Sequence, residues 1–195
     1  MLETELAPGI LVAAPSMDDP NFAGTVVLMA EHGEDGAVGF VLNKPAPLTL
    51  LGLLDKVDQD LLDEAKAQGV TDQHVLMGGP VQKHIAWVLY RREDDGELDD
   101  GSIPIGEELC VGASLDTLRA CVRGEKKGPF HVILGYSGWG EQQLEGEIGH
   151  GAWLPLDLGD DFAFEVPIDE RWDTAIRRLG LVPGGFFMGG SGAEA

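Results

Sequence analysis

Basic residues are scarce in this sequence. The chain of 195 residues holds 13 Lys and Arg against 34 Asp and Glu, so its formal net charge is −21 at pH 7. A surface of that sign repels DNA, RNA and anionic lipid. The basic residues include scattered pairs, at residues 91–92, 126–127 and 177–178, each near acidic ones. The composition therefore argues against direct nucleic-acid binding, and the acidity fits either basic protein partners or simple solubility.

Cysteine and long apolar runs are scarce as well. Cys110 and Cys121 match no metal or redox spacing, so we expect two buried free thiols, which fits a reducing cytoplasm. No apolar run approaches the roughly 18 residues that a membrane-spanning helix needs. Residues 1–5 lack the basic and apolar segments of a signal peptide. We therefore predict a cytoplasmic protein without a membrane segment.

Recognisable metal and cofactor motifs are missing too. Neither of the glycine-rich nucleotide motifs, Walker A and GxGxxG, occurs in the sequence. The five histidines show no ligand spacing, and we expect His131, which lies within a predicted strand, to be a hydrogen-bonded core residue. The sequence thus predicts neither a bound metal nor a cofactor.

The chain instead contains many short apolar segments separated by glycine, proline and acidic turns. This spacing predicts hairpins and a few segregated helices, and therefore an α+β fold, not a doubly wound one. We expect one domain over residues 1–183, an exposed hairpin tip at 91–101 and a glycine-rich tail at 184–195 that frays. Thr49, Ser114 and Asp169 are predicted to cap helices. Strands are expected at residues 9–14, 25–31, 37–42, 75–77, 85–90, 103–105, 109–111, 130–136, 152–156 and 162–166, and helices at 48–57, 60–68, 114–123, 141–148 and 170–179.

Residues 133–148 form the most constrained stretch. A buried strand is predicted to run into a glycine-rich turn, LGYSGWG at residues 134–140, and then into a short amphipathic helix. Glycine at 135, 138 and 140 permits a sharp turn, or the close approach of another group to the backbone. Tyr136 and Trp139 lie within that turn. We call residues 135–147 the junction.

Four interpretations of the junction stay open. It lies within one residue of a GxSxG nucleophile elbow around Ser137, but Trp139 stands where that turn needs glycine. The glycines could form an anion-binding nest, although Glu141 and Glu145 would oppose a phosphate there. They could also form a purely structural turn, or line a cleft. The helix carboxylates, including Glu147, are expected on a solvated face.

Several stretches taken together resemble the YqgE/AlgH family of bacterial cytoplasmic proteins. They are LAPGILVA at 6–13, DPNF at 19–22, TVVL at 25–28, GFVLNKP at 39–45, GGPV at 78–81, the junction, GAWL at 151–154 and the helix around Trp172. The resemblance implies a single α+β unit with a β-barrel-like, mixed antiparallel sheet core and flanking helices. It also implies a link, through one member, to transcriptional regulation of alginate synthesis, and no established enzymatic activity.

The sequence departs from the family pattern at four places. Ser137 stands where Ala is common, Glu141 where Pro is frequent and His131 where Arg is common. The tail lacks the Gly-His-Ala ending, so the resemblance assigns that tail no role here.

Polar and glycine residues at predicted strand ends complete the candidate site. If these strand ends converge on the junction, they line one cleft beside its aromatic residues, as binding sites are commonly built. We hypothesise a non-enzymatic regulatory or interaction protein that binds an unidentified protein or small molecule there, with any transcriptional effect indirect. A hydrolase-like enzyme using Ser137 or a junction acid, a small-molecule-binding protein and a purely structural subunit are the alternatives. The candidate residues are Asn21, Asn43, Gly78, Gly79, Tyr136, Ser137, Gly138, Trp139, Gln143 and Glu147.

Overall fold

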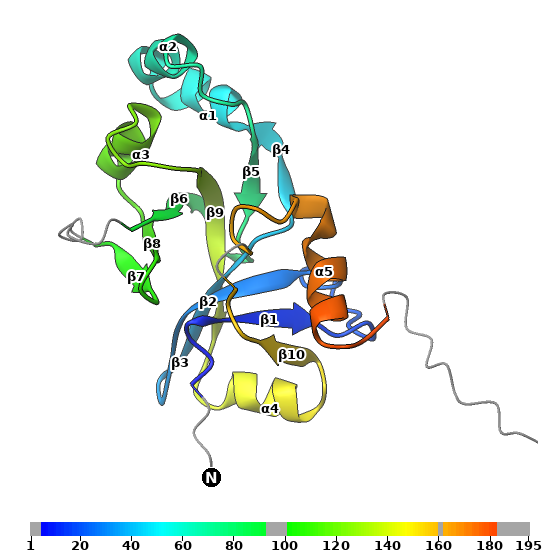
Figure 1. Cartoon of the computed structure of the whole chain (residues 1–195). Coiled ribbons are helices and arrows are strands. Elements are labelled where there is room, and N and C mark those ends of the chain that lie inside the picture. Colours follow the sequence, from blue (N-terminus) through cyan, green and yellow to red (C-terminus); the bar gives the residue numbers. More distant parts are fainter. Residues whose placement is uncertain (1–4, 93–100, 160–161, 183–195) are drawn as a thin grey trace, which may run out of the picture.

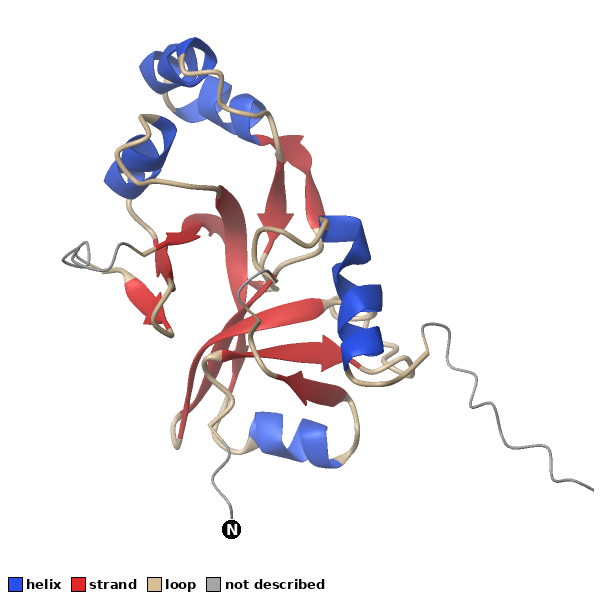
Figure 2. Ribbon diagram, in the orientation of Figure 1, coloured by secondary structure: helices blue, strands red, loops and turns tan. Residues whose placement is uncertain are grey.

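The computed structural model describes residues 5–92, 101–159 and 162–182. Most of the predicted hairpin tip, and the predicted tail, lie outside the described residues. Figure 2 shows strands at the centre and helices around them. The strands are β1 (Gly9–Ala13), β2 (Val26–Gly33), β3 (Gly36–Val41), β4 (Pro45–Thr49), β5 (His74–Met77), β6 (Val81–Arg91), β7 (Ile103–Ile105), β8 (Leu109–Gly112), β9 (Phe130–Trp139) and β10 (Trp153–Leu156). The helices are α1 (Leu50–Val57), α2 (Gln59–Ala67), α3 (Leu115–Val122), α4 (Gln143–Gly149) and α5 (Arg171–Arg178).

One mixed, mainly antiparallel sheet organises the described part of the chain (Figure 1). Its strands follow the order β10-β1-β2-β3-β9-β6-β8-β7, and each neighbouring pair is antiparallel. β5 lies parallel to β9 and pairs with β4 on its other side. β7 approaches β2, but no pairing between described residues joins these strands, so the sheet is not closed. The predicted α+β class is therefore confirmed.

Local sequence signals place several elements correctly. β2 and β3 form the predicted hairpin, with its turn at residues 33–36. The Thr49 hydroxyl accepts a hydrogen bond from the Gly52 N–H at 3.3 Å, and the Ser114 hydroxyl accepts one from the Asp116 N–H at 3.1 Å. Both predicted N-caps are thus confirmed, because each satisfies a first-turn donor that the helix leaves unpaired.

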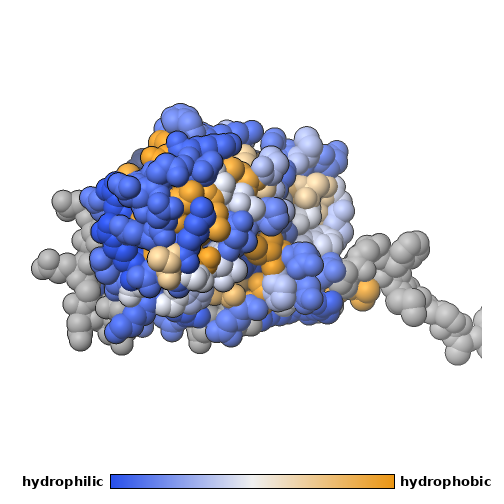
Figure 3. Space-filling model, turned by 90° about the horizontal axis from the view of Figure 1, so that it is seen from above, coloured by the Kyte–Doolittle hydropathy of each residue, from blue (hydrophilic) through white to orange (hydrophobic). Residues whose placement is uncertain are grey.

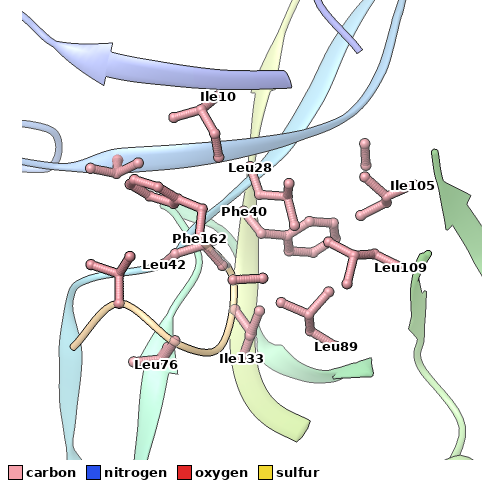
Figure 4. Close-up of a cluster of buried hydrophobic side chains, with 14 of the residues drawn as sticks. Ile10, Leu28, Phe40, Leu42, Leu76, Leu89, Ile105, Leu109, Ile133 and Phe162 are labelled. Carbon is pink, nitrogen blue, oxygen red and sulfur yellow. The ribbon is translucent and has the colours of Figure 1, made fainter. Parts of the chain in front are cut away.

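Three apolar clusters stabilise the packing of the sheet with the helices around it. The first lies between the sheet, α5 and the segment 162–166, and the second lies beneath α1, α2 and α3. The second cluster includes Cys110 and Cys121, which are buried and not joined in a disulfide, as predicted. The third lies beneath α4 and contains two tryptophans. Figure 4 labels members of the first cluster: Ile10, Leu28, Phe40, Leu42, Leu76, Leu89, Ile105, Leu109, Ile133 and Phe162.

Two predictions near the C-terminal helix are wrong. Residues 162–166 form turns, not a strand, and their apolar side chains fill the first cluster. The carbonyls of Ala163 and Val166 are hydrogen-bonded by the Arg171 side chain instead of by a neighbouring strand. Asp169 does not cap α5, because a 3-10 turn at Ile168–Glu170 leads directly into the helix and no described side chain caps it.

Candidate functional site

The junction is a strand for most of its predicted turn. β9 continues through Trp139, and the chain turns only at residues 140–142, where Gln142 has a φ of 57°. Gly135 lies inside β9 with a φ of +69°. A Cβ atom there would lie 2.6 Å from the Val81 carbonyl oxygen, so the β6 backbone occupies the space that a side chain would need. Another group therefore does approach the Gly135 backbone closely, and that group is the backbone of the neighbouring strand β6.

The two glycines of the GGPV stretch lie directly against the junction. A Cβ atom on Gly79, whose φ is +155°, would overlap the Tyr136 carbonyl oxygen. The Ser137 hydroxyl donates to the Gly78 carbonyl oxygen at 3.0 Å, and Ser137 is fully buried. The Gly78–Gly79 segment and the junction therefore lie in contact. The geometry of this contact gives Ser137 a structural bond in place of the exposure that a nucleophile needs.

Glu147 holds helix α4 onto the sheet. Its Oε2 atom accepts hydrogen bonds from the indole nitrogens of Trp139 at 3.1 Å and Trp153 at 2.8 Å. Its Oε1 atom accepts one from Gln143 at 2.9 Å. The other amide atom of Gln143 accepts the Gly140 N–H at 3.1 Å, which fixes the turn before the helix. Glu147 is thus a hydrogen-bonded support and not part of a solvated face, whereas Glu141 and Glu145 are exposed as predicted.

Asn43 and its neighbours anchor the loop at residues 15–24. The Asn43 side chain accepts the Val26 N–H and donates to the Gly24 carbonyl, both at 2.9 Å. The Lys44 ammonium donates to the carbonyls of Pro20 and Asn21 at 3.0 and 3.2 Å.

That loop carries Phe22 to Trp139 of the junction and Trp153 of β10. Its ring stacks on Trp139 at 6.2 Å between centroids and meets the edge of Trp153 at 5.3 Å. The candidate residues Asn21 and Asn43 are therefore linked to Trp139 only through the loop that carries Phe22. Asn21 and Asn43 make their own hydrogen bonds with residues of that loop and with Val26, and Trp139 makes its hydrogen bond with Glu147.

The four candidate residues on β9, residues 136–139, divide between its two sides. Ser137 and Trp139 point into packed interior, with exposed fractions of 0% and 6%. Tyr136 is partly exposed and Gly138 is exposed, and Val38 of β3 pairs with Gly138. Trp87 of β6 meets the Tyr136 ring edge-on at 6.4 Å. We call Val38, Trp87, Tyr136 and Gly138 the outer patch; sequence reasoning missed its Trp87 and Val38, because no local pattern pairs β3 or β6 with β9.

A buried polar network crosses the first apolar cluster. Arg171 is 1% exposed and donates hydrogen bonds to the carbonyls of Leu42, Ala163 and Val166. Its Nη2 atom also lies 3.2 Å from Nε2 of His131. Burial, with the neighbouring Arg171 charge, lowers the pKa of His131 to about 4, and burial lowers the pKa of Arg171 to about 10.

The partners of His131 fix its tautomer. The Gln73 amide nitrogen donates to the Phe130 carbonyl at 2.6 Å, so the Gln73 amide oxygen faces Nδ1 of His131 at 3.1 Å and accepts a hydrogen bond from the Nδ1–H group. Nε2 of His131 then accepts a hydrogen bond from Arg171, and the Ala163 carbonyl oxygen, 3.2 Å from Nε2, accepts its hydrogen bond from Arg171 at 2.8 Å. His131 is the hydrogen-bonded core residue that was predicted; its partners Arg171 and Gln73 were not foreseen, since their sequence separations are 40 and 58 residues.

A polar hollow lies elsewhere, between α2 and α3. This interhelical groove has a volume of about 330 Å³. Arg119 pairs with Asp58 at 2.9 Å and with Asp116 at 3.0 Å, and Arg123 pairs with Glu64 at 2.6 Å. Seen from above, the side of the molecule that carries these helices is mostly hydrophilic (Figure 3). The groove is lined by Asp58, Asp60, Leu61, Glu64, Asp116, Arg119 and Arg123.

The described residues contain neither a cluster of metal-ligand side chains nor a membrane-spanning helix. Their His, Cys, Asp and Glu side chains form no group of three or more that could hold a metal ion. None of their helices has the length and apolar character that crossing a bilayer requires.

Comparison with known proteins identifies the family. A family model described as AlgH-like matches residues 10–184. A UPF0301 protein of Anaeromyxobacter sp. (strain Fw109-5) is 51% identical over 191 residues, 97% of this chain and 96% of that protein. A UPF0301 protein of Photobacterium profundum is 40% identical over 173 residues, 89% of this chain and 91% of that protein. The solution structure of the AlgH protein from Pseudomonas aeruginosa superposes with a TM-score of 0.70 at 33% identity, covering 93% of this chain and 92% of that one. The chain therefore belongs to the AlgH-like family, as its sequence stretches predicted.

Proposed function

We propose that this protein is a non-enzymatic regulatory protein that acts by binding another molecule at the outer patch. The observation that carries the proposal is the division of β9 into two sides. Ser137, Trp139 and Glu147 use their polar atoms in internal hydrogen bonds. On the other side, Tyr136 is partly exposed, and its hydroxyl makes no hydrogen bond with a described residue.

The alternative of a hydrolase is less well supported by this geometry. A serine nucleophile must reach its substrate and be activated by an adjacent base. Ser137 is 0% exposed, and its hydroxyl proton is directed to the Gly78 carbonyl oxygen. The net charge of −21 further favours an indirect route for any transcriptional effect, through a protein or small-molecule partner, since duplex DNA repels such a surface.

Native mass spectrometry of the protein purified without denaturant tests the proposal. Gly138→Val places a side chain at the exposed Gly138 position of the outer patch, where an added Cβ would meet only the Tyr136 ring at 3.5 Å. Gly146→Ala is the matched control, since nothing lies within 4 Å of a Cβ there. We expect a retained small molecule, or a complex with an added partner, in the parent and the control but not in Gly138→Val. Equal occupancy in all three proteins would contradict binding at the outer patch.

The interhelical groove supports a second candidate, the binding of a basic protein segment. Four carboxylates and two guanidinium groups line the groove. Val57 and Leu115, which are 56% and 43% exposed, adjoin two lining residues in sequence and offer apolar contacts. A decalysine peptide should bind more weakly to Asp60→Asn than to the parent, with the affinity falling as salt rises. Asp35→Asn, in the distant β2–β3 turn, is the control. If both variants lost the same affinity for decalysine, the peptide would be responding to the net charge of the protein and not to the groove.

A further inference from the structure

Trp87 is the exception among the four tryptophans. The indole nitrogens of Trp139 and Trp153 donate to Glu147, and that of Trp172 donates to the Ala13 carbonyl at 2.8 Å. The Trp87 indole nitrogen is buried and has no hydrogen-bond acceptor among the described residues. A buried donor without an acceptor raises the free energy of the folded state, so native structures seldom leave one unexplained.

The surroundings of Trp87 are apolar and lie at the edge of the first cluster. Phe40 meets the Trp87 ring edge-on at 5.4 Å between centroids, and Tyr136 does so at 6.4 Å. Phe40 is fully buried, whereas Trp87 and Tyr136 are partly exposed, so the three rings lead from the core to the surface. The Tyr136 ring also lies against Gly138, whose missing side chain leaves that position open.

The backbone around these rings is unusually constrained. The pairing of β6 with β9 shifts register between Val81 and Ala86, so β6 bulges beside Gly135. Gln82 in this bulge has a φ of 46°, a left-handed conformation that non-glycine residues rarely adopt. Bulges and strained residues gather at functional sites, where they direct side chains. Here they place Trp87 and Tyr136 on either side of the irregular segment.

We propose that Trp87 and Tyr136 form a binding site for a small, largely apolar molecule that carries a neutral carbonyl group. Its carbonyl oxygen accepts the hydrogen bond that the Trp87 N–H lacks, and its apolar part packs on the Tyr136 ring after that ring turns away from the indole. A neutral acceptor fits better than an anion, because the chain carries a net charge of −21. This inference rests on the proposed function, since it names the ligand class for the outer patch.

Nuclear magnetic resonance of the ¹⁵N-labelled protein tests the ligand class. The four indole N–H groups give four signals, and the one that disappears in Trp87→Phe belongs to Trp87. Benzamide, which has a carbonyl acceptor, and toluene, which has none, are the two probes. We expect benzamide to move the Trp87 indole signal downfield and to bind about tenfold more weakly to Trp87→Phe, the ratio that one hydrogen bond of ordinary strength gives. Toluene should bind both proteins equally.

Each outcome decides the ligand class or the site. A Trp87 indole signal that is already downfield and does not respond to benzamide would mean that water alone satisfies the donor, and would overturn the inference. Movement of the backbone amide signals of residues 136–138 without movement of the Trp87 indole would keep the outer patch and remove this ligand class. The shift is read in the parent protein, and if Trp87→Phe does not fold, the Trp87 signal is assigned by nuclear Overhauser effects to the neighbouring Phe40 and Tyr136 rings. Trp153→Phe, which removes an indole that already has an acceptor, should leave the benzamide affinity unchanged wherever the variant folds.

Discussion

Acid should destabilise this protein through His131 as the pH falls below 6.5. The folded-state pKa of about 4 lies 2.5 below the ordinary value of 6.5, because burial and the Arg171 charge disfavour the imidazolium. The unfolded chain binds the proton below pH 6.5 and the folded protein does not. The stabilisation is therefore complete above pH 6.5, declines as the pH falls toward 4, and changes no further below 4.

The magnitude follows from the two pKa values. Between pH 7 and pH 5 the unfolded state gains about 2 kcal/mol from protonation of this one side chain, and the folded state gains almost nothing. Because a domain of ordinary stability has only about 5–15 kcal/mol in total, the loss should be plain in a urea titration. The four tryptophans supply the fluorescence signal.

His131→Gln removes the titration and keeps a donor and an acceptor for its partners. The free energy of unfolding of the parent should fall between pH 7 and pH 5 by about 2 kcal/mol more than that of the variant. His84→Gln, at an exposed position on β6, is the control and should follow the parent. Parallel pH profiles for the parent and His131→Gln would refute the account of the buried network.

Three further substitutions test the junction by urea unfolding. Ser137→Ala should cost about 1 kcal/mol, the usual net value of one hydrogen bond, and an ester panel should show no change in turnover. Glu147→Gln removes the charged oxygen that accepts both indole N–H groups and should cost about 1–3 kcal/mol, with a shift in tryptophan emission. Gly79→Ala should prevent folding or cost more than either, because its Cβ would overlap the β9 backbone at a φ of +155°, whereas Gly146→Ala should be neutral or stabilising.

The features that were predicted correctly from the sequence are those that depend on residues adjacent to one another along the chain. Caps at Thr49 and Ser114, the β2–β3 hairpin and the amphipathic α4 each follow from a few adjacent side chains. Of the three junction glycines, only Gly135 is constrained, and the cause is the close approach of another backbone segment, which was one of the two predicted causes. A positive φ inside a strand needs an irregular partner strand, and nothing near residue 135 in sequence announces β6.

Long-range polar contacts explain the remaining errors. The segment 162–166 has the apolar alternation of a strand, but in the structure the buried Arg171 guanidinium donates to its Ala163 and Val166 carbonyls, which a strand would present to a neighbouring strand. From the sequence pattern alone, Arg171 cannot be distinguished from an ordinary charged helix residue. Likewise the outer patch joins residues from three strands, and its least expected member, Trp87, is informative only through a hydrogen bond that it does not make with any described residue.

The residues that carry the family resemblance are, for the most part, one another's structural partners. Asn43 holds the loop that delivers Phe22, Phe22 packs on Trp139, and Trp139 shares the Glu147 carboxylate with Trp153. Removing any of these groups should therefore unfold or loosen the protein, whatever it binds. A search for function by mutation is better directed at residues whose loss the fold tolerates. The Tyr136 hydroxyl meets that condition, because it bonds to no described residue, whereas the Tyr136 ring packs against the first cluster. Tyr136→Phe should therefore separate binding from stability in a way that Trp139→Ala cannot.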